Sequence, residues 1–335
     1  MPKATNANLD RYRRTPHLFP IYSVFHQFRD VGAAFTGKGT DPANRHFSFH
    51  RPPPVDNDPT EISQHFRANL QQLASAMGFE PGSLLLPNGA WPHSGHAIIA
   101  EDEEYTWIEN EASGTLMPVV TKTTQVVTYD AIASRSSRHV LAVQGADCPA
   151  IFLYDPCARV MGLAHAGWKP LVRNVVGNVL EAMVQLGAHQ RNILAYISAG
   201  AGDQYNVFKW DEDMEDSVTD VFVQGGRSDL LGDTTIRHEM TAQDCARLQA
   251  ALGSRQTDTV EEVKATTTSF KLSYLARTEL IRCGISESNI SCNEESTIVE
   301  RYLSPDREIS GLMKYHSYRR ECPHHGLSIS VLFLK

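Results

Sequence analysis

Cys148 and His165 carry the side chains with the clearest chemistry in this sequence. Cys148 lies in the segment GADCPA at 145–150 and His165 in AHAGWK at 164–169, and each segment follows an apolar run typical of a strand. Loops that follow strands often carry functional residues because a rigid scaffold positions them. A thiolate and an imidazole together suit zinc. Their separation in the sequence is too long for a zinc finger, so the fold must assemble any shared site.

The same two residues allow two other interpretations. A cysteine and a histidine can act as a thiolate nucleophile and its base without any metal. Alternatively, the cysteine can be a small buried hydrophobic residue and the histidine an ordinary hydrogen-bonded polar residue. The residue types alone leave these alternatives open beside the zinc site.

The elements that must position these residues mix strands and helices without a regular alternation. Strands are predicted at 139–144, 151–154, 160–164, 193–198, near 290 and at 327–334, with short strands between 21 and 36. Helices are predicted at 60–77, 171–186 and 272–283, where apolar residues recur at helical spacing and a glycine follows. The acidic stretch at 100–128 is interpreted as a surface excursion, and 203–265 as several short helices. This order favours an α+β fold.

Length and composition indicate a globular protein and exclude two classes of partner. The 335 residues are 41% hydrophobic and 21% charged, which is sufficient for a substantial core. A net charge of -8 argues against a nucleic-acid partner, and no segment approaches the roughly 20 apolar residues of a membrane span. The six cysteines show no CxxC pair, so we expect reduced thiols and a cytoplasmic location. Residues 1–20 are expected to be a flexible lead-in and 21–335 a single domain.

The sequence resembles the laccase-domain family, also called the multicopper polyphenol oxidase-like or purine nucleoside phosphorylase family. The central motifs are GADCPAIFLYDP and GLAHAGWK, followed by NILAYISAGAG. YDAIAS before the first of these, HSYRR near the end and the closing GLSISVLFL resemble further family elements, so the match covers roughly 25–334. The resemblance implies mixed, largely antiparallel sheets layered with helices in an α/β/β/α-like order. Relatives with this pattern include peptidoglycan-editing proteins.

The resemblance also implies a zinc ion held by three protein ligands. Two of these ligands correspond to Cys148 and His165, and the third is a histidine from a QVHG-like element. This chain has WPHSGH there, so we expect His93 to be the third ligand, with His96 as the competitor. Three protein ligands leave a fourth position open, which is typical of catalytic zinc, and zinc lowers the pKa of bound water to about 7.

The implied activity is phosphorolysis of purine nucleosides (adenosine, inosine, guanosine or methylthioadenosine), together with adenosine deamination. Its partners would be a nucleoside and phosphate, and the oligomeric state is left open. Asp147 and His96 are the candidate catalytic groups. The candidate substrate-binding residues are Lys38, Trp168, Lys169, Arg319 and Arg320. Several motifs depart from the family pattern, including Gly37-Lys38 in place of Thr-Arg and HAGWKP in place of HAGWRG.

Three other functions remain open at this point. Some bacterial relatives hydrolyse an amide bond in peptidoglycan precursors. Copper-dependent phenol oxidation is less favoured than zinc chemistry, because nothing in the sequence supplies the additional histidine clusters of a multicopper oxidase. The departures from the family motifs also allow a non-catalytic binding or scaffold protein.

Overall fold

The central strands are buried on both faces, and the fold is built from two facing sheets. The computed structural model describes residues 21–39, 47–49, 61–87, 92–207, 218–253, 268–303, 310–322 and 325–335. In strand β9 (Ala150–Asp155), Phe152 and Tyr154 join the apolar cluster between the sheets, whereas Ile151 and Leu153 join the cluster beneath the helices. Successive strand residues face opposite sides of a sheet, so one apolar run contributes to two layers of core.

The first sheet has seven strands in the described ranges. Their order is β1 (Ile21–Ser23), β2 (Val31–Thr36), β15 (Ser328–Leu334), β8 (Val140–Gly145), β3 (Leu84–Leu85), β6 (Thr115–Val120) and β5 (Tyr105–Asn110). Helix α2 (Glu61–Met77) covers the outer face of this sheet, where Phe66, Leu70 and Leu73 pack with Val331 and Phe333.

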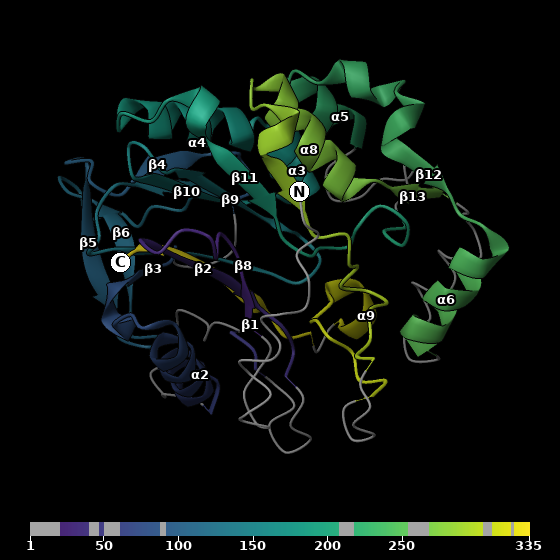
Figure 1. Ribbon diagram of the computed structural model, residues 1–335, viewed down its shortest axis with the longest axis horizontal. Helices are drawn as coiled ribbons and strands as arrows, with labels where there is room; N and C mark the ends of the chain where they lie inside the picture. Colours follow the sequence, from purple (N-terminus) through teal and green to yellow (C-terminus); the bar gives the residue numbers. More distant parts are fainter. Residues whose placement is uncertain are drawn as a thin grey trace.

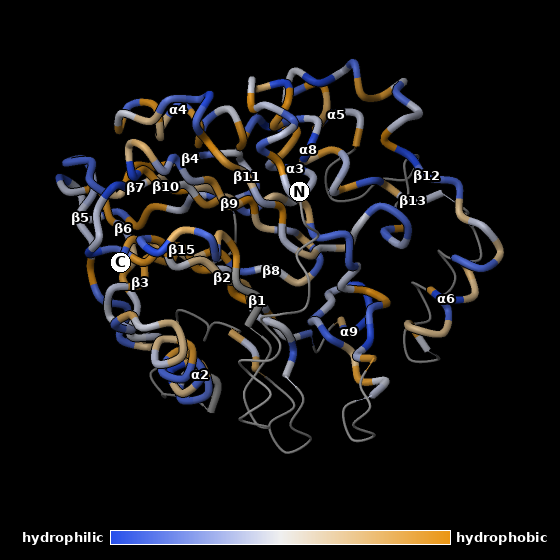
Figure 2. The backbone as a smooth tube through the Cα atoms, viewed as in Figure 1, coloured by the Kyte–Doolittle hydropathy of each residue, from blue (hydrophilic) through white to orange (hydrophobic). Residues whose placement is uncertain are grey.

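The second sheet has six strands in the described ranges and carries most of the helices. Its order is β14 (Ile290–Cys292), β11 (Leu194–Ile197), β9, β10 (Val160–His165), β7 (Ala131–Ser134) and β4 (Ala97–Ile99). The helices over its outer face are α3 (Trp168–Val172), α4 (Val175–Gln185), α5 (Val218–Gln224) and α8 (Leu272–Arg282). Figure 1 shows these helices on one side of the paired sheets and α2 on the other. Figure 2 shows the hydrophobic residues concentrated in the sheet layers between them.

This four-layer order is the expected α/β/β/α arrangement in one domain. Most strand pairs are antiparallel, and the parallel pairs are β3 with β6 and β8, β4 with β7, and β11 with β14. The predicted strands at 139–144, 151–154, 160–164, 193–198 and 327–334 correspond to β8, β9, β10, β11 and β15. The helices predicted at 60–77 and 272–283 are also confirmed, as α2 and α8.

Two predictions about the elements were wrong. The predicted helix at 171–186 is two helices, because Asn174 adopts a left-handed conformation (φ 64°) between α3 and α4. The stretch at 100–128 is not a surface excursion. It contains the antiparallel pair β5–β6, and β6 is buried well enough for Val119 to be 3% exposed.

The remaining elements lie in or near the stretch predicted as short helices. Residues 203–265 contain α5, helix α6 (Ala242–Leu252) and strand β12 (Arg237–Glu239), while 208–217 and 254–265 lie outside the described residues. Strand β12 pairs with β13 (Thr268–Phe270), and the short helix α9 (Tyr318–Glu321) precedes β15. The proposed lead-in at 1–20 lies outside the described residues. None of the described helices is both long and apolar enough to cross a bilayer.

Candidate metal centre

Cys148 and His165 meet because β9 and β10 pair in an antiparallel register. His165, the last residue of β10, lies opposite Ala150, the first residue of β9, and Cys148 is in the turn that enters β9. The backbone of Gly167 passes both side chains, since a Cβ added there would lie 3.0 Å from Sγ of Cys148 and 3.6 Å from Cε1 of His165. The side chain of His165 hydrogen-bonds with Cys148. The two residues that sequence reasoning singled out are therefore neighbours.

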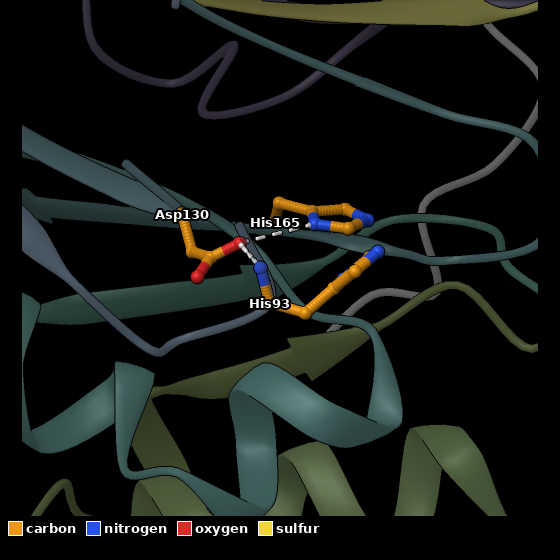
Figure 3. Close-up of side chains that lie close together, drawn as sticks. All are labelled: His93, Asp130 and His165. Atoms are coloured by element: carbon orange, nitrogen blue, oxygen red, sulfur yellow. Dashed lines mark hydrogen bonds and ion pairs between the residues drawn. The ribbon is translucent and has the colours of Figure 1, made fainter. Parts of the chain in front are cut away.

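Asp130 connects His165 to the loop that carries His93. Its carboxylate is fully buried, and Oδ1 lies 3.8 Å from Nδ1 of His165. The same carboxylate accepts hydrogen bonds from the backbone N–H of His93 (3.2 Å), the backbone N–H of Gly95 (2.8 Å) and the hydroxyl of Ser94 (3.4 Å). Figure 3 shows Asp130 beside both histidines, with the ring nitrogens farther from Asp130 pointing in the same direction.

His93, Asp130 and His165 form the cluster with metal-binding geometry. Each offers one donor atom within 4.8 Å of the others, and the two imidazole rings lie 5.7 Å apart between centroids. Asp130 is already engaged by the backbone of the His93 loop, so its position suits the orientation of His165 through Nδ1. That arrangement leaves Nε2 of His165 for a metal. The cluster found among the described residues is thus two imidazoles and a carboxylate, and Cys148 neighbours His165 without belonging to it.

Burial and neighbouring charges set the protonation of the two histidines. Burial alone would lower the pKa of His165, but the adjacent Cys148 and Asp130 side chains raise it to about 9. Burial lowers the pKa of His93, and the positive charges of His165, Lys169 and Arg173 lower it further against the opposing effect of Asp130. Metal binding requires neutral imidazoles, so a metal would displace the proton that His165 otherwise holds.

The His93 loop is held in an uncommon backbone conformation. His93 has φ 51° and Gly95 φ 76°, and a Cβ added at Gly95 would lie 2.2 Å from the carbonyl oxygen of Arg173. The guanidinium of Arg173 donates to the carbonyl of His93 (2.6 Å), and the amide of Asn178 donates to that of Gly95 (2.8 Å). Such strain persists only where surrounding contacts impose it, and it is frequent at functional sites.

His96 lies outside this cluster. Its side chain is exposed, and Nδ1 lies 3.3 Å from the carbonyl oxygen of Thr128. The structure thus brings His93 to His165 and places His96 in a groove beside β4. The assignment of His93 as third ligand stays a prediction, as does a catalytic role for His96.

Asp147 is half-buried next to Cys148 and turns its carboxylate toward the C-terminal segment. Oδ1 accepts from the hydroxyl of Thr297 (2.6 Å) and Oδ2 from the backbone N–H of Arg319 (2.8 Å). Burial raises the pKa of Asp147, while the hydrogen bonds from Arg319, Thr297 and Ser317 lower it. Its backbone has φ 113°, which is rare for a residue with a side chain. These contacts tie the Cys148 turn to the C-terminal segment, and a catalytic role for Asp147 stays a prediction.

Lys38 and Arg320, two predicted substrate-binding cations, already have protein partners. Arg320 donates to the carbonyl oxygens of Thr297 (2.6 Å), Ile298 (2.7 Å) and Tyr315 (2.5 Å). Both Arg320 and Lys38 form ion pairs with Glu321. The two cations therefore connect the segments around α9.

Trp168 and Lys169 directly follow the His165 motif. The Trp168 ring stacks on Phe222 (6.1 Å between centroids, 27° between planes), and Nζ of Lys169 lies 5.7 Å from the Trp168 ring centre. Lys169 is close enough to lower the pKa of His93. Arg319 follows the Tyr318 that begins α9, and its backbone binds Asp147. Among the predicted substrate-binding residues, Lys169 has the clearest electrostatic relation to the cluster.

A cavity beside Cys148 is too small for a substrate. It has a volume of about 20 Å³ and is lined by Asp147, Cys148, Ser198, Thr297 and Tyr315, among others. This volume is enough for roughly one water molecule. A nucleoside would therefore have to approach the cluster from another side.

Sequence reasoning did not select Asp130 and Arg173 as site residues. Asp130 had a signal, because it lies in YDAIAS immediately before β7, in a motif already matched to the family. Arg173 had none, since its role depends on the break between α3 and α4 that the helical pattern did not reveal.

The family model described as multi-copper polyphenol oxidoreductase laccase matches residues 56–249, which is more than half of the chain. The chain belongs to this family. Purine nucleoside phosphorylase ORF3 of Streptomyces griseus is 32% identical to it over 142 residues, 42% of this chain and 49% of that protein. A purine nucleoside phosphorylase of Deinococcus radiodurans is 42% identical over 79 residues, 23% of this chain and 31% of that protein. The matches thus span about half or less of these relatives.

Solved structures of family members share the fold. The Bacillus licheniformis hypothetical protein YfiH superposes with a TM-score of 0.61 at 18% identity, over 96% of this chain and 97% of that chain. YlmD from Geobacillus stearothermophilus superposes with a TM-score of 0.58 at 16% identity, over 96% of this chain and 100% of that chain. At these identities the likeness establishes the architecture alone.

Proposed function

We propose that this family member is a zinc-dependent purine nucleoside phosphorylase that also deaminates adenosine. The observation that supports the proposal is the cluster of His93, Asp130 and His165, together with the position of Cys148 beside His165 at the end of β10. The relatives named purine nucleoside phosphorylase supply the substrate class. Nucleoside and phosphate are therefore the proposed small-molecule partners.

In this proposal, His93, Cys148 and His165 hold the zinc ion. When bound, zinc would supply a Lewis acid and lower the pKa of a water molecule to about 7. Asp130, whose Oδ1 lies 3.8 Å from Nδ1 of His165, would orient that ring so that it presents Nε2 to the ion. Phosphate binding also requires a positively charged side chain. Lys169 is the proposed contact because it is close enough to His93 for its charge to lower the pKa of that residue.

The two proposed reactions differ in the bond that breaks. Phosphorolysis of adenosine breaks the bond between C1′ of the ribose and N9 of adenine. A phosphate oxygen forms the new bond to C1′, which gives ribose-1-phosphate and adenine. Deamination replaces the amino group at C6 with oxygen from water and releases ammonia. Lys169 would stabilise the phosphate only in the first reaction, so Lys169→Ala should lower phosphorolysis more than deamination.

The experiment compares metal content and products in matched cysteine variants. The protein is purified without a histidine tag, and zinc and copper are measured per chain. Adenosine with phosphate is then added, and chromatography separates adenine with ribose-1-phosphate from inosine. Cys148→Ala should lose both zinc and turnover, whereas Cys157→Ala, which removes an exposed thiol, should retain both.

Three results would overturn the proposal. If Cys148→Ala retained zinc and activity, Cys148 would not be a ligand and the proposed site would be wrong. Cleavage of alanyl-seryl muropeptides without nucleoside turnover would assign amide hydrolysis instead. Stoichiometric zinc with none of these products would indicate a non-catalytic protein.

A further inference from the structure

An open groove lies along the outer edge of β4, separate from the candidate metal ligands. It has a volume of about 270 Å³, and residues from β4, from α4 and from the approach to β5 line it. Figure 1 shows α4 running above β4, with β5 at the same end of the molecule. His93, Cys148 and His165 are absent from its lining, so a ligand there would occupy a distinct site.

The floor of this groove is a strand edge with outward-facing backbone groups. β4 is the last strand of its sheet within the described residues, and it pairs with β7 on its inner side. The carbonyl of His96 accepts from Ala131, and the N–H of Ala100 donates to Ala133. The backbone N–H and C=O groups of successive strand residues point to opposite edges of the strand. Those of Ile98 therefore point toward β7, whereas those of Ala97 and Ile99 point into the groove. The Ile99 carbonyl accepts from Asp102, so within the described part of the chain the N–H groups of Ala97 and Ile99 and the Ala97 carbonyl form the edge.

The walls of the groove are polar and acidic. Asp102 and Glu181 contribute exposed carboxylates, and Gln185 contributes an exposed amide. No lysine or arginine is among the lining residues in the described part of the chain. Asp102 belongs to the run EDEE at 101–104, which adds negative charge at the same end. The groove therefore favours a cationic ligand.

We propose that this groove binds an extended, basic segment of a partner protein, which adds to β4 as a further strand. Strand addition takes its affinity from main-chain hydrogen bonds and its specificity from the side chains along the edge. The backbone of Ala97 and Ile99 supplies the main-chain hydrogen bonds, and the carboxylates of Asp102 and Glu181 favour lysine or arginine side chains. A short edge and surface charges imply weak, salt-sensitive binding.

The test measures fluorescence anisotropy of a labelled peptide of alternating lysine and valine, against a matched peptide of alternating glutamate and valine. The lysine peptide should bind and the glutamate peptide should not, and added salt should weaken binding. Ala97→Pro removes the outward N–H without removing a bond to β7, because proline is tolerated where the N–H faces away from the sheet. It should weaken binding about fivefold, roughly the value of one hydrogen bond, while Ala97→Ser keeps the N–H and the affinity.

A second variant keeps the test decisive if Ala97→Pro fails to fold. Glu181→Gln preserves the shape of the exposed side chain and removes its charge, so it should weaken the lysine peptide by up to about fivefold. Equal binding of both peptides, or affinity unchanged in Ala97→Pro and Glu181→Gln, would overturn the proposal. So would a dimer in analytical ultracentrifugation that Ala97→Pro dissociates, because a second copy would then occupy the edge.

Discussion

The carboxylate of Asp130 lies 3.8 Å from Nδ1 of His165 while it also accepts hydrogen bonds from the backbone of the His93 loop. One buried side chain thus contacts two of the three candidate zinc ligands, His165 at the end of β10 and His93 in the loop before β4. Ligating histidines commonly use their second nitrogen in this way, and the outer partner then sets both ring orientation and ligand basicity. Asp130, which immediately precedes β7, therefore connects that strand to the candidate metal centre.

Replacing Asp130 should weaken zinc binding without removing a ligand. In Asp130→Asn the shape is kept, but one acceptor oxygen becomes a donor that faces the N–H groups of the His93 loop or the His165 ring. We expect the zinc dissociation constant to rise about 10–100-fold, measured by competition with a chromogenic chelator. Circular dichroism checks that the fold persists. An unchanged constant in a folded variant would show that Asp130 does not support the metal.

The alternative histidines can be separated by substituting each one alone. His93→Ala should remove a zinc ligand and lower the affinity by more than the about 10–100-fold expected for an outer partner. His96→Ala should leave zinc binding intact, because the ring of His96 is exposed and directed toward Thr128. Metal analysis after dialysis against a weak chelator distinguishes the two. The reverse pattern would make His96 the ligand.

The layered fold followed from the sequence because its signals are local or repetitive. Apolar runs at β9, β10 and β15 predicted strands, and helical spacing with a terminal glycine predicted α2 and α8. The break at Asn174 was missed because the apolar period continues across it, and only the backbone conformation reveals it. β5 and β6 were missed because no residue of β5 is fully buried and the strand follows the acidic run at 101–104.

The candidate site was predictable only where a motif names the residue. Cys148, His165 and His93 came from short motifs, and the structure brings these motifs together. Lys38 and Arg320 were selected for their charge, yet both are ion-paired with Glu321, a residue about 280 positions from Lys38 that no pattern connects to it. The sequence does not indicate whether a lysine or arginine pairs with a carboxylate of the protein or binds a substrate.

Arg320 should contribute to stability more than to substrate binding. Its side chain is 6% exposed and joins Glu321 with the backbone at Thr297 and Tyr315. Arg320→Ala leaves Glu321 with one cation fewer and three carbonyls without their donor, so we expect a loss of about 3–5 kcal/mol in unfolding free energy. Urea denaturation measures it. Arg319→Ala is the matched control, because Asp147 is bound by the Arg319 backbone and that bond survives the substitution.

Glu321 should make stability depend on pH in the acidic range. Although burial alone would raise its pKa, the nearby His316 side chain (3.7 Å) and the charges of Arg320 and Lys38 hold the pKa of Glu321 well below its usual value. A depressed pKa stabilises the fold above the unfolded value, about 4.3, and this contribution is lost as pH falls through the folded value. Urea unfolding below about pH 4.3 should therefore be less pH-dependent in Glu321→Gln than in the parent protein. Parallel curves would contradict this role.

The tight approach of Gly95 to Arg173 should make a single added methyl group act on the metal centre. Gly95 (φ 76°) and Gly226 (φ 70°) share a left-handed backbone, but an added Cβ meets the Arg173 carbonyl at 2.2 Å in the first case and open space in the second. Gly226→Ala should cost only the conformational strain, about 1–2 kcal/mol. Gly95→Ala should cost a further amount of about 1–3 kcal/mol from the overlap. Because Gly95 follows His93 by two residues and binds Asp130, Gly95→Ala should also weaken zinc binding, whereas Gly226→Ala should not. Calorimetric unfolding and chelator competition on both variants test this prediction. Equal losses of stability with equal zinc affinity would show that the loop relaxes around the methyl group without moving His93.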